Sequence, residues 1–206
     1  MFAPRSDTWM LAEELTRDPR VGGAVLDVCT GSGAIAISAA LASARSVTAV
    51  DVSRRALATV RINARLNGVR VRTRRGELLD AVPGETFDLI VANPPYLPSS
   101  GRLPARGAAR HTEAGPDGRT LLDRLIAQAP RHLAPGGALL VTHSSINGEE
   151  RTLERMREAG LEPSVLARRR GPLGPLLAAR APELEHAGLL DPGVREEDVL
   201  VVAGAS

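Results

Sequence analysis

The chain has 206 residues, of which 43% are apolar, and this is enough to bury the core of one α/β domain. Its 26 basic and 24 acidic residues leave a formal net charge of +2, so overall charge does not favour a general binder of polyanions. No lysine occurs, and we attribute the use of arginine alone to a genome rich in G and C. A single cysteine, Cys29, excludes an internal disulfide and a cysteine-cluster metal site.

The N-terminal sequence lacks the apolar core of a signal peptide, and no apolar run approaches the length of a membrane span. We therefore expect a cytoplasmic protein that has no membrane partner. No internal repeat or linker divides the chain, so we expect one domain over residues 1–206. Within it, residues 1–22 are an N-terminal segment with a helix, and residues 97–116 are a loop on the substrate side.

Strand and helix patterns alternate along the chain. Short apolar runs predict strands over 24–28, 47–50, 69–73, 87–92, 138–142, 162–167 and 198–203. Longer amphipathic or small-residue segments predict helices over 34–44, 53–66, 118–133, 149–159 and 173–186. This alternation predicts an α/β fold with a doubly wound, mostly parallel seven-stranded sheet. For the last strand pair we expect an antiparallel C-terminal edge strand.

The most specific motif is Asn93-Pro94-Pro95-Tyr96, at the end of the predicted strand 87–92. Two consecutive prolines fix φ and remove two backbone donors, which leaves carbonyl groups without partners. An Asn amide, a Pro carbonyl and a Tyr ring together suit a planar –NH2 group, because two acceptors can hold its N–H bonds while the ring stacks on its face. The motif therefore indicates chemistry on an amide or amino nitrogen.

A second motif, Gly31-x-Gly33-x-x-Ala36, follows a predicted strand and begins a helix, the context in which such a loop binds a nucleotide. Asp51 ends the next strand, where its carboxylate can accept both hydroxyls of a ribose. Dinucleotide oxidoreductases and S-adenosylmethionine (SAM) methyltransferases both use this arrangement, and a simple tight turn is the structural alternative. All three elements are expected at the carboxyl edge of the sheet, which favours a ligand site.

These residues carry a resemblance. The stretch 25–36 looks like motif I of class I SAM-dependent methyltransferases, which have a Rossmann-like fold, and more narrowly resembles the HemK-type release-factor glutamine methyltransferases. Three further segments are similar to that family: Pro4–Thr8, the Asn-Pro-Pro-Tyr motif, and 114–119 leading to 133–137. The resemblance covers nearly the whole chain, without the N-terminal helical domain of the long members. It implies a short-form catalytic domain.

The resemblance also implies roles for individual residues. Those implied to bind the cofactor SAM are Thr8, Asp27, Gly31, Gly33, Asp51, Val52, Glu77 and Asn93. Asp51 would bind the ribose hydroxyls, Val52 would pack on the adenine, and Glu77 stands where the family usually has Asp against the adenine amino group. Asn93, Pro94 and Tyr96 are implied to be catalytic, and with Pro95 they would bind the acceptor. No metal is expected.

The favoured acceptor is a protein glutamine side chain of the release-factor Gly-Gly-Gln type, which makes a release factor-like protein the expected partner. An adenine amine of nucleic acid or a small-metabolite amine is the alternative acceptor, and an NAD-dependent oxidoreductase ranks below both. Trp9 is interpreted equally as a ligand wall or as a helix anchor. We call the motif Asn93-Pro94-Pro95-Tyr96 the clamp. The basic residues of the loop after the clamp are expected either to contact substrate or to be solvated; they are Arg102, Arg106, Arg110 and His111.

Overall fold

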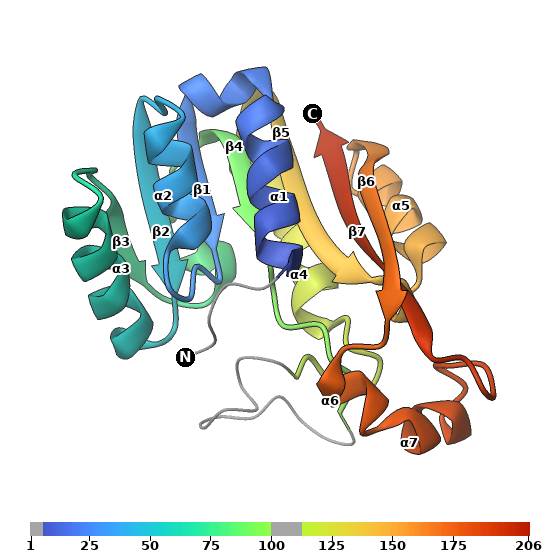
Figure 1. Ribbon diagram of the computed structural model, residues 1–206. Helices are drawn as coiled ribbons and strands as arrows, with labels where there is room; N and C mark the ends of the chain where they lie inside the picture. Colours follow the sequence, from blue (N-terminus) through green and yellow to red (C-terminus); the bar gives the residue numbers. More distant parts are fainter. Residues whose placement is uncertain (1–5, 100–112) are drawn as a thin grey trace.

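Seven strands form one sheet in the order β3-β2-β1-β4-β5-β7-β6 (Figure 1) in the computed structural model, which describes residues 6–99 and 113–206. The strands are β1 Ala24–Val28, β2 Ser46–Asp51, β3 Arg72–Arg75, β4 Phe87–Ala92, β5 Leu133–Ser144, β6 Glu162–Pro172 and β7 Glu196–Ala205. The first five pair in parallel, and β7 is antiparallel to both of its neighbours. The predicted α/β fold with a mostly parallel seven-stranded sheet is confirmed.

Helices cover both faces of the sheet because its central strands are apolar on both sides. Val25 of β1 joins the core beneath the helices of one face, and Leu26 joins the core beneath those of the other. The first face carries α1 (Ser6–Arg17), α2 (Ala34–Leu41) and α3 (Arg54–Leu66), and the second carries α4 (Thr120–Gln128) and α5 (Glu149–Glu158). A third apolar cluster joins α6 (Pro175–Ala178) and α7 (Ala181–His186) to Leu97, just after β4.

The expected antiparallel C-terminal strand needs one correction, because it does not lie at the edge of the sheet. β7 is antiparallel, but it is inserted between β5 and β6, and β6 takes the edge. The cause is visible in the burial of the two strands. Residues 200–204 of β7 are buried, whereas β6 alternates between exposed and half-buried side chains and tolerates the solvent of an edge.

Some element boundaries also differ from the sequence prediction. The predicted helix 173–186 is two short helices, because Pro175 and Pro182 each favour the first turn of a new helix. The helix predicted over 118–133 begins at Thr120 and ends at Gln128, where a 3₁₀ turn containing Pro130 follows. The third strand, predicted over 69–73, occupies Arg72–Arg75 instead.

The parallel register places three chain turns side by side at one edge of the sheet. β1 lies between β2 and β4, and residues that end the three strands are register partners: Val28 pairs with Val50 and with Ala92. The residues that follow these strands therefore meet in one place, at the carboxyl edge where ligands bind in open α/β sheets. No helix in the described part of the chain is long and apolar enough to cross a membrane.

Candidate active site

The turn that follows β1 is made of backbone that only glycine adopts easily. φ is +55° at Gly31 and +84° at Gly33, in the left-handed region that other residues rarely occupy. A Cβ at Gly33 would lie 3.0 Å from the Val60 side chain of α3, so a larger residue would also be crowded. The turn therefore brings backbone groups, and not side chains, to the carboxyl edge of the sheet.

Asp51 holds this turn from the neighbouring strand. Its Oδ2 accepts a hydrogen bond from the Gly31 N–H at 3.0 Å, and its Oδ1 accepts one from the Ser53 N–H at 2.8 Å. The side chain is 7% exposed at the end of β2. Each carboxylate oxygen has a second lone pair, so this geometry leaves acceptor capacity for a pair of ligand hydroxyls.

Asp27 is a buried carboxylate with one oxygen left over. Its Oδ2 accepts hydrogen bonds from Thr30 Oγ1 at 2.5 Å and from the Ala36 N–H at 3.0 Å. Its Oδ1 is buried and has no hydrogen-bond partner among the described residues. Burial raises the pKa of Asp27 to about 7, against the lowering effect of the two hydrogen bonds. An unpaired buried carboxylate oxygen fits a cationic or N–H-bearing ligand group.

The two residues expected at the adenine differ in burial and in whether another side chain already binds them. Val52 is half-buried directly after β2. Glu77 begins the short 3₁₀ turn after β3, and its Oε2 forms an ion pair with Arg124 Nη1 of α4 at 2.9 Å. The Glu77 side chain is 41% exposed, so a ligand contact there would compete with this ion pair and with water.

The Asn-Pro-Pro-Tyr segment is oriented by α1. Asn93 Nδ2 donates to Asp7 Oδ2 at 3.2 Å and lies 3.3 Å from Thr8 Oγ1, which accepts a second hydrogen bond. The Tyr96 hydroxyl donates to the same Asp7 oxygen at 3.2 Å. None of the hydrogen bonds among the described residues uses Asn93 Oδ1 or the Pro94 carbonyl. The segment therefore keeps two acceptors without a hydrogen bond among the described residues, while its side-chain donors are engaged.

Asp7 is the residue that sequence reasoning did not single out. It lies within the Pro4–Thr8 segment, whose Thr8 was assigned to the cofactor, but nothing local shows that its carboxylate reaches Asn93 and Tyr96. The available signal was an acid one position before that Thr, at the start of a helix. A contact between residues 86 positions apart is a property of the tertiary fold.

Asn147 holds the backbone of the same segment by a hydrogen bond. Its Nδ2 donates to the Tyr96 carbonyl at 2.8 Å and to the Asp117 carbonyl at 3.2 Å. Gly118 packs so closely against the Tyr96 carbonyl that a Cβ at this position would clash with it. The backbone of Tyr96 is thus held between the loop before α4 and the turn after β5.

Arg119 anchors this second support. Its side chain is 1% exposed, although it carries a full charge. Its Nη1 donates to the Asn147 carbonyl at 2.5 Å and to Thr152 Oγ1 at 2.9 Å, and its Nη2 forms an ion pair with Asp123 at 2.6 Å. The ion pair and these hydrogen bonds compensate the cost of burying the guanidinium and fix the position of the Asn147 backbone.

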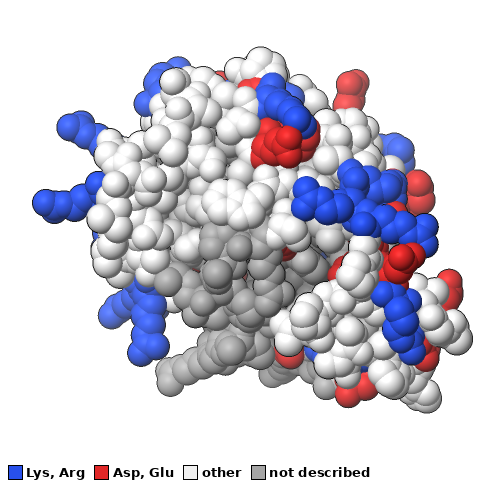
Figure 2. All heavy atoms as spheres, viewed as in Figure 1, with Lys and Arg blue, Asp and Glu red and all other residues white. Residues whose placement is uncertain are grey.

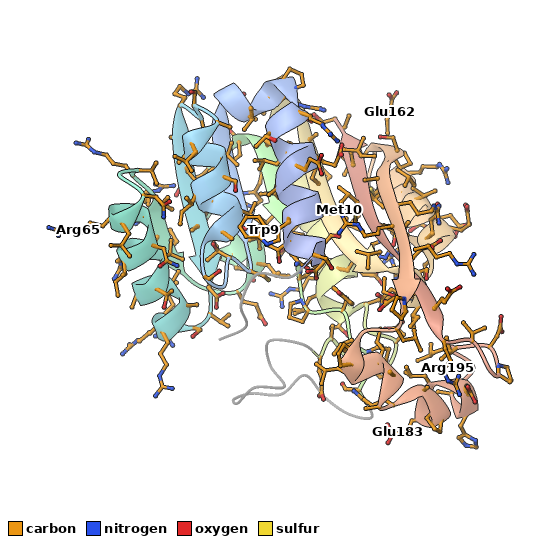
Figure 3. All side chains as sticks on the ribbon, viewed as in Figure 1. Trp9, Met10, Arg65, Glu162, Glu183 and Arg195 are labelled. Carbon is orange, nitrogen blue, oxygen red and sulfur yellow. The ribbon has the colours of Figure 1, made fainter. Side chains whose placement is uncertain are left out.

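The aromatic residues Phe87 and Trp9 lie in different environments. Phe87 is buried in the core. Trp9 is 55% exposed on α1, one residue before the buried Met10 (Figure 3), and it lines a shallow depression of about 300 Å³ together with residues of α2 and α3. The buried face of α1 does not include Trp9, which speaks against the helix anchor, and the depression contains none of the residues expected to bind a ligand. Phe2, Pro4 and the basic loop residues 102, 106, 110 and 111 lie outside the described residues.

The chain is similar to methyltransferases in sequence. A family model described as the methyltransferase small domain matches residues 6–107. A putative protein N5-glutamine methyltransferase of Methanocaldococcus jannaschii is 31% identical over 88% of this chain and 91% of its own length. A release factor glutamine methyltransferase of Deinococcus radiodurans is 42% identical over 80% of this chain and 61% of its own length. A ribosomal protein uL3 glutamine methyltransferase of Bordetella pertussis is 40% identical over 68% of this chain and 51% of its own length.

A solved structure agrees with the fold. The methyltransferase complex of E. cuniculi that is described as methylating a translation termination factor contains a chain that aligns with a TM-score of 0.70 and 24% identity, over 100% of this chain and 98% of that one. This likeness concerns the arrangement of the sheet and its helices. The chain spans roughly half to three fifths of the two bacterial relatives and nearly all of the Methanocaldococcus relative.

Proposed function

The chain belongs to the family of protein glutamine methyltransferases, and from this premise we propose that it transfers a methyl group from SAM to the amide nitrogen of a protein glutamine. The favoured acceptor is the glutamine of a release factor, because relatives that carry this name match most of the chain. We treat residues 1–206 as one catalytic domain, and a reducing cytoplasm suits its free Cys29.

The carboxyl edge supports SAM binding by the chemistry of its donors and acceptors. The unpaired Asp27 Oδ1 suits the ammonium group of the methionine part, and Thr8 lies at the same end. Asp51 suits the ribose hydroxyls, the Gly31–Gly33 turn lets backbone approach closely, and Val52 and Glu77 flank the adenine position. When bound, SAM supplies an electrophilic methyl group on a sulfonium.

The clamp would bind the acceptor amide and activate its nitrogen. A glutamine amide nitrogen is a weak nucleophile, since its lone pair is delocalised into the carbonyl group. Asn93 Oδ1 and the Pro94 carbonyl would each accept one N–H bond, which raises electron density on the nitrogen and stabilises the positive charge that develops there. The Tyr96 ring would stack on the amide plane, and Pro95 keeps the backbone rigid. The protein's main contribution would be to position the acceptor amide and to stabilise the charge that develops on its nitrogen.

One observation carries this proposal. Asp7 engages both the Asn93 amide N–H and the Tyr96 hydroxyl, so the side-chain donors of the clamp are occupied and Asn93 Oδ1 remains as an acceptor for an incoming –NH2 group. A surface of this polarity complements an amide N–H2 and disfavours a carbonyl or phosphate in the same place.

The test is a transfer assay with radiolabelled SAM. The acceptors are a release-factor domain with its Gly-Gly-Gln loop, the same domain with that glutamine replaced by asparagine, ribosomal protein uL3, DNA, RNA and a metabolite extract. We expect label in the release-factor domain and none in its asparagine variant. Label that enters only nucleic acid or metabolites contradicts the glutamine assignment, and label that enters only uL3 contradicts the release factor.

The cofactor is tested separately by calorimetric titration with SAM and with NAD. We expect SAM to bind and NAD to give no heat of binding, because the clamp has no role in hydride transfer. Binding of NAD without SAM would contradict the proposed function as a whole.

A further inference from the structure

One segment of the chain carries arginine without any acidic residue. Residues 52–76 contain eight arginines and no Asp or Glu, so the segment carries +8 while the rest of the chain carries −6. α3 supplies Arg54, Arg55, Arg61 and Arg65. The loop after it and β3 supply Arg70, Arg72, Arg74 and Arg75. All eight side chains are exposed, and we call them the α3–β3 basic surface.

These arginines differ from the others in their partners. Elsewhere in the described chain, eleven of fourteen arginines form an ion pair with a carboxylate. Within the α3–β3 basic surface only Arg72 does so, with Glu85. Arg61 and Arg75 make hydrogen bonds to neutral oxygens of Thr73 and Val52. The surface therefore carries a concentrated positive charge that carboxylates compensate only at Arg72 among the described residues.

The eight arginines gather at one edge of the sheet, on α3, on the loop after it and on β3. Arg54, Arg61 and Arg65 share one face of α3, because they are spaced seven and four residues apart. Arg61 Nε donates to Thr73 Oγ1 at 2.9 Å, so this face adjoins β3. β3 is the edge strand of the sheet, and Arg65 extends into solvent beside it (Figure 3). Figure 2 shows basic and no acidic side chains along this edge of the molecule.

Two general explanations do not account for the surface. A genome rich in G and C replaces lysine by arginine, but it does not remove aspartate and glutamate from one segment and leave them elsewhere. Charges on an edge strand hinder its pairing with other chains, but four of these arginines lie on a helix. Like charges this close repel one another and weaken folding, so a binding partner is the more economical explanation.

We propose that the α3–β3 basic surface binds the phosphate backbone of RNA. Exposed guanidinium groups bind phosphate through paired, charge-assisted hydrogen bonds and need no pocket to do so. RNA is preferred over an acidic protein because the proposed acceptors belong to translation; the choice of RNA thus rests on the proposed function. The surface adjoins the cofactor half of the site, since Arg75 is the register partner of Asp51, yet it leaves the clamp free.

The experiment compares two variants with equal charge changes. In the first, Arg54→Gln, Arg65→Gln and Arg74→Gln are combined; none of these side chains makes a hydrogen bond or ion pair with the described residues. The matched control combines Arg131→Gln, Arg157→Gln and Arg169→Gln, three exposed arginines outside this surface that form no ion pair with the described residues; Arg169 donates only to the Ser6 carbonyl, at 3.4 Å. The probe is a fluorescein-labelled RNA hairpin, measured by fluorescence anisotropy over a salt series.

We expect the surface variant to bind the hairpin at least about tenfold more weakly than the wild type. The slope of log affinity against log salt should fall by about 2 to 3, one phosphate contact being lost per arginine. The control variant should stay within about twofold of the wild type. Equal loss in both variants overturns the proposal, because it would show that only net charge matters.

Two further probes decide the occupant. Tighter binding of poly-glutamate, or of a DNA hairpin, than of the RNA hairpin overturns the choice of RNA. Methyl transfer to the isolated release-factor domain should be unchanged in the surface variant, because none of its substitutions lies in the clamp or the glycine turn. If the wild type binds RNA but transfers no methyl group to any protein, the proposed function fails while the basic surface keeps its assignment.

Discussion

The two halves of the candidate site are built in different ways. In the cofactor half, hydrogen bonds join residues close in the chain: Asp27 to Thr30 and Ala36, and Gly31 to Asp51, at most 20 positions apart. In the acceptor half, Asp7 reaches Asn93 and Tyr96 over 86 and 89 positions. The Asp27, Gly31 and Asp51 part of the cofactor half is a property of one strand–helix–strand unit, whereas the acceptor half exists only when the whole sheet is assembled.

This difference indicates which substitutions should damage each half of the site. Substitutions remote from the clamp should damage the acceptor half through its supports, while the cofactor half should respond mainly to its own residues. The experiments below test this division, from the largest expected effect to the smallest.

Arg119→Met should have the largest effect. It removes the buried guanidinium that holds the Asn147 carbonyl, and it leaves that carbonyl without its partner and Asp123 with only the longer pair to Arg151. We expect a loss of about 3 to 5 kcal/mol in the free energy of unfolding, measured by urea denaturation. Arg17→Met, which breaks only exposed pairs on α1, serves as the control and should lose far less. Equal losses in the two variants would show that Arg119 is no special anchor.

Asn93→Ala should come next and should separate the two halves. Methyl transfer is expected to fall by about 100- to 1,000-fold, because one of the two acceptors for the amide is lost. The Kd for SAM, measured by calorimetry, should change by less than about threefold, which corresponds to the loss of an interaction used mainly in transfer. A large loss of SAM binding would place Asn93 in the cofactor half instead.

The third experiment concerns pH and the cofactor half. Burial raises the pKa of Asp27 to about 7, and the deprotonated form is the one that pairs with an ammonium group. SAM affinity should therefore rise up to about tenfold between about pH 6 and pH 8, and Asp27→Asn should remove this rise. The same raised pKa lowers the stability of the free protein as pH increases from about 4 to about 7. An unchanged pH profile in the Asn variant would exclude Asp27 as its source.

Asp7→Asn should give the smallest effect, in the acceptor half only. Asp7 accepts through both oxygens, Oδ1 from the Thr8 N–H and Oδ2 from Asn93 and Tyr96, and the single acceptor oxygen of an Asn cannot keep both sets of hydrogen bonds. We expect kcat to fall by roughly three- to tenfold with SAM affinity unchanged. Glu13→Gln, an exposed change on the same helix, is the control.

A double-variant cycle sharpens this test. Tyr96→Phe removes the hydroxyl that donates to Asp7 and keeps the ring, so its effect on kcat should not add to that of Asp7→Asn. Fully additive effects would mean that Asp7 does not act through Tyr96.

The sequence predicted much of the fold and less of the site. Strand–helix alternation was sufficient for the mostly parallel sheet, because apolar runs ended by Gly, Asp or Asn are local signals. The position of β7 inside the sheet was not predictable in the same way. It depends on which of the last two strands pairs with β5, and this pairing joins segments far apart in the chain.

The amino-acid sequence by itself determined the glycine turn, the acid at the end of β2 and the Asn-Pro-Pro-Tyr segment, since backbone angles and strand ends follow from neighbouring residues. Only the tertiary structure brought Asp7 to the clamp, buried Arg119 behind it and gathered eight arginines at one edge of the sheet. The physical reason is the range of the interactions: φ preferences act within a few residues, whereas a hydrogen bond or a charged surface needs groups that the folded chain alone brings together.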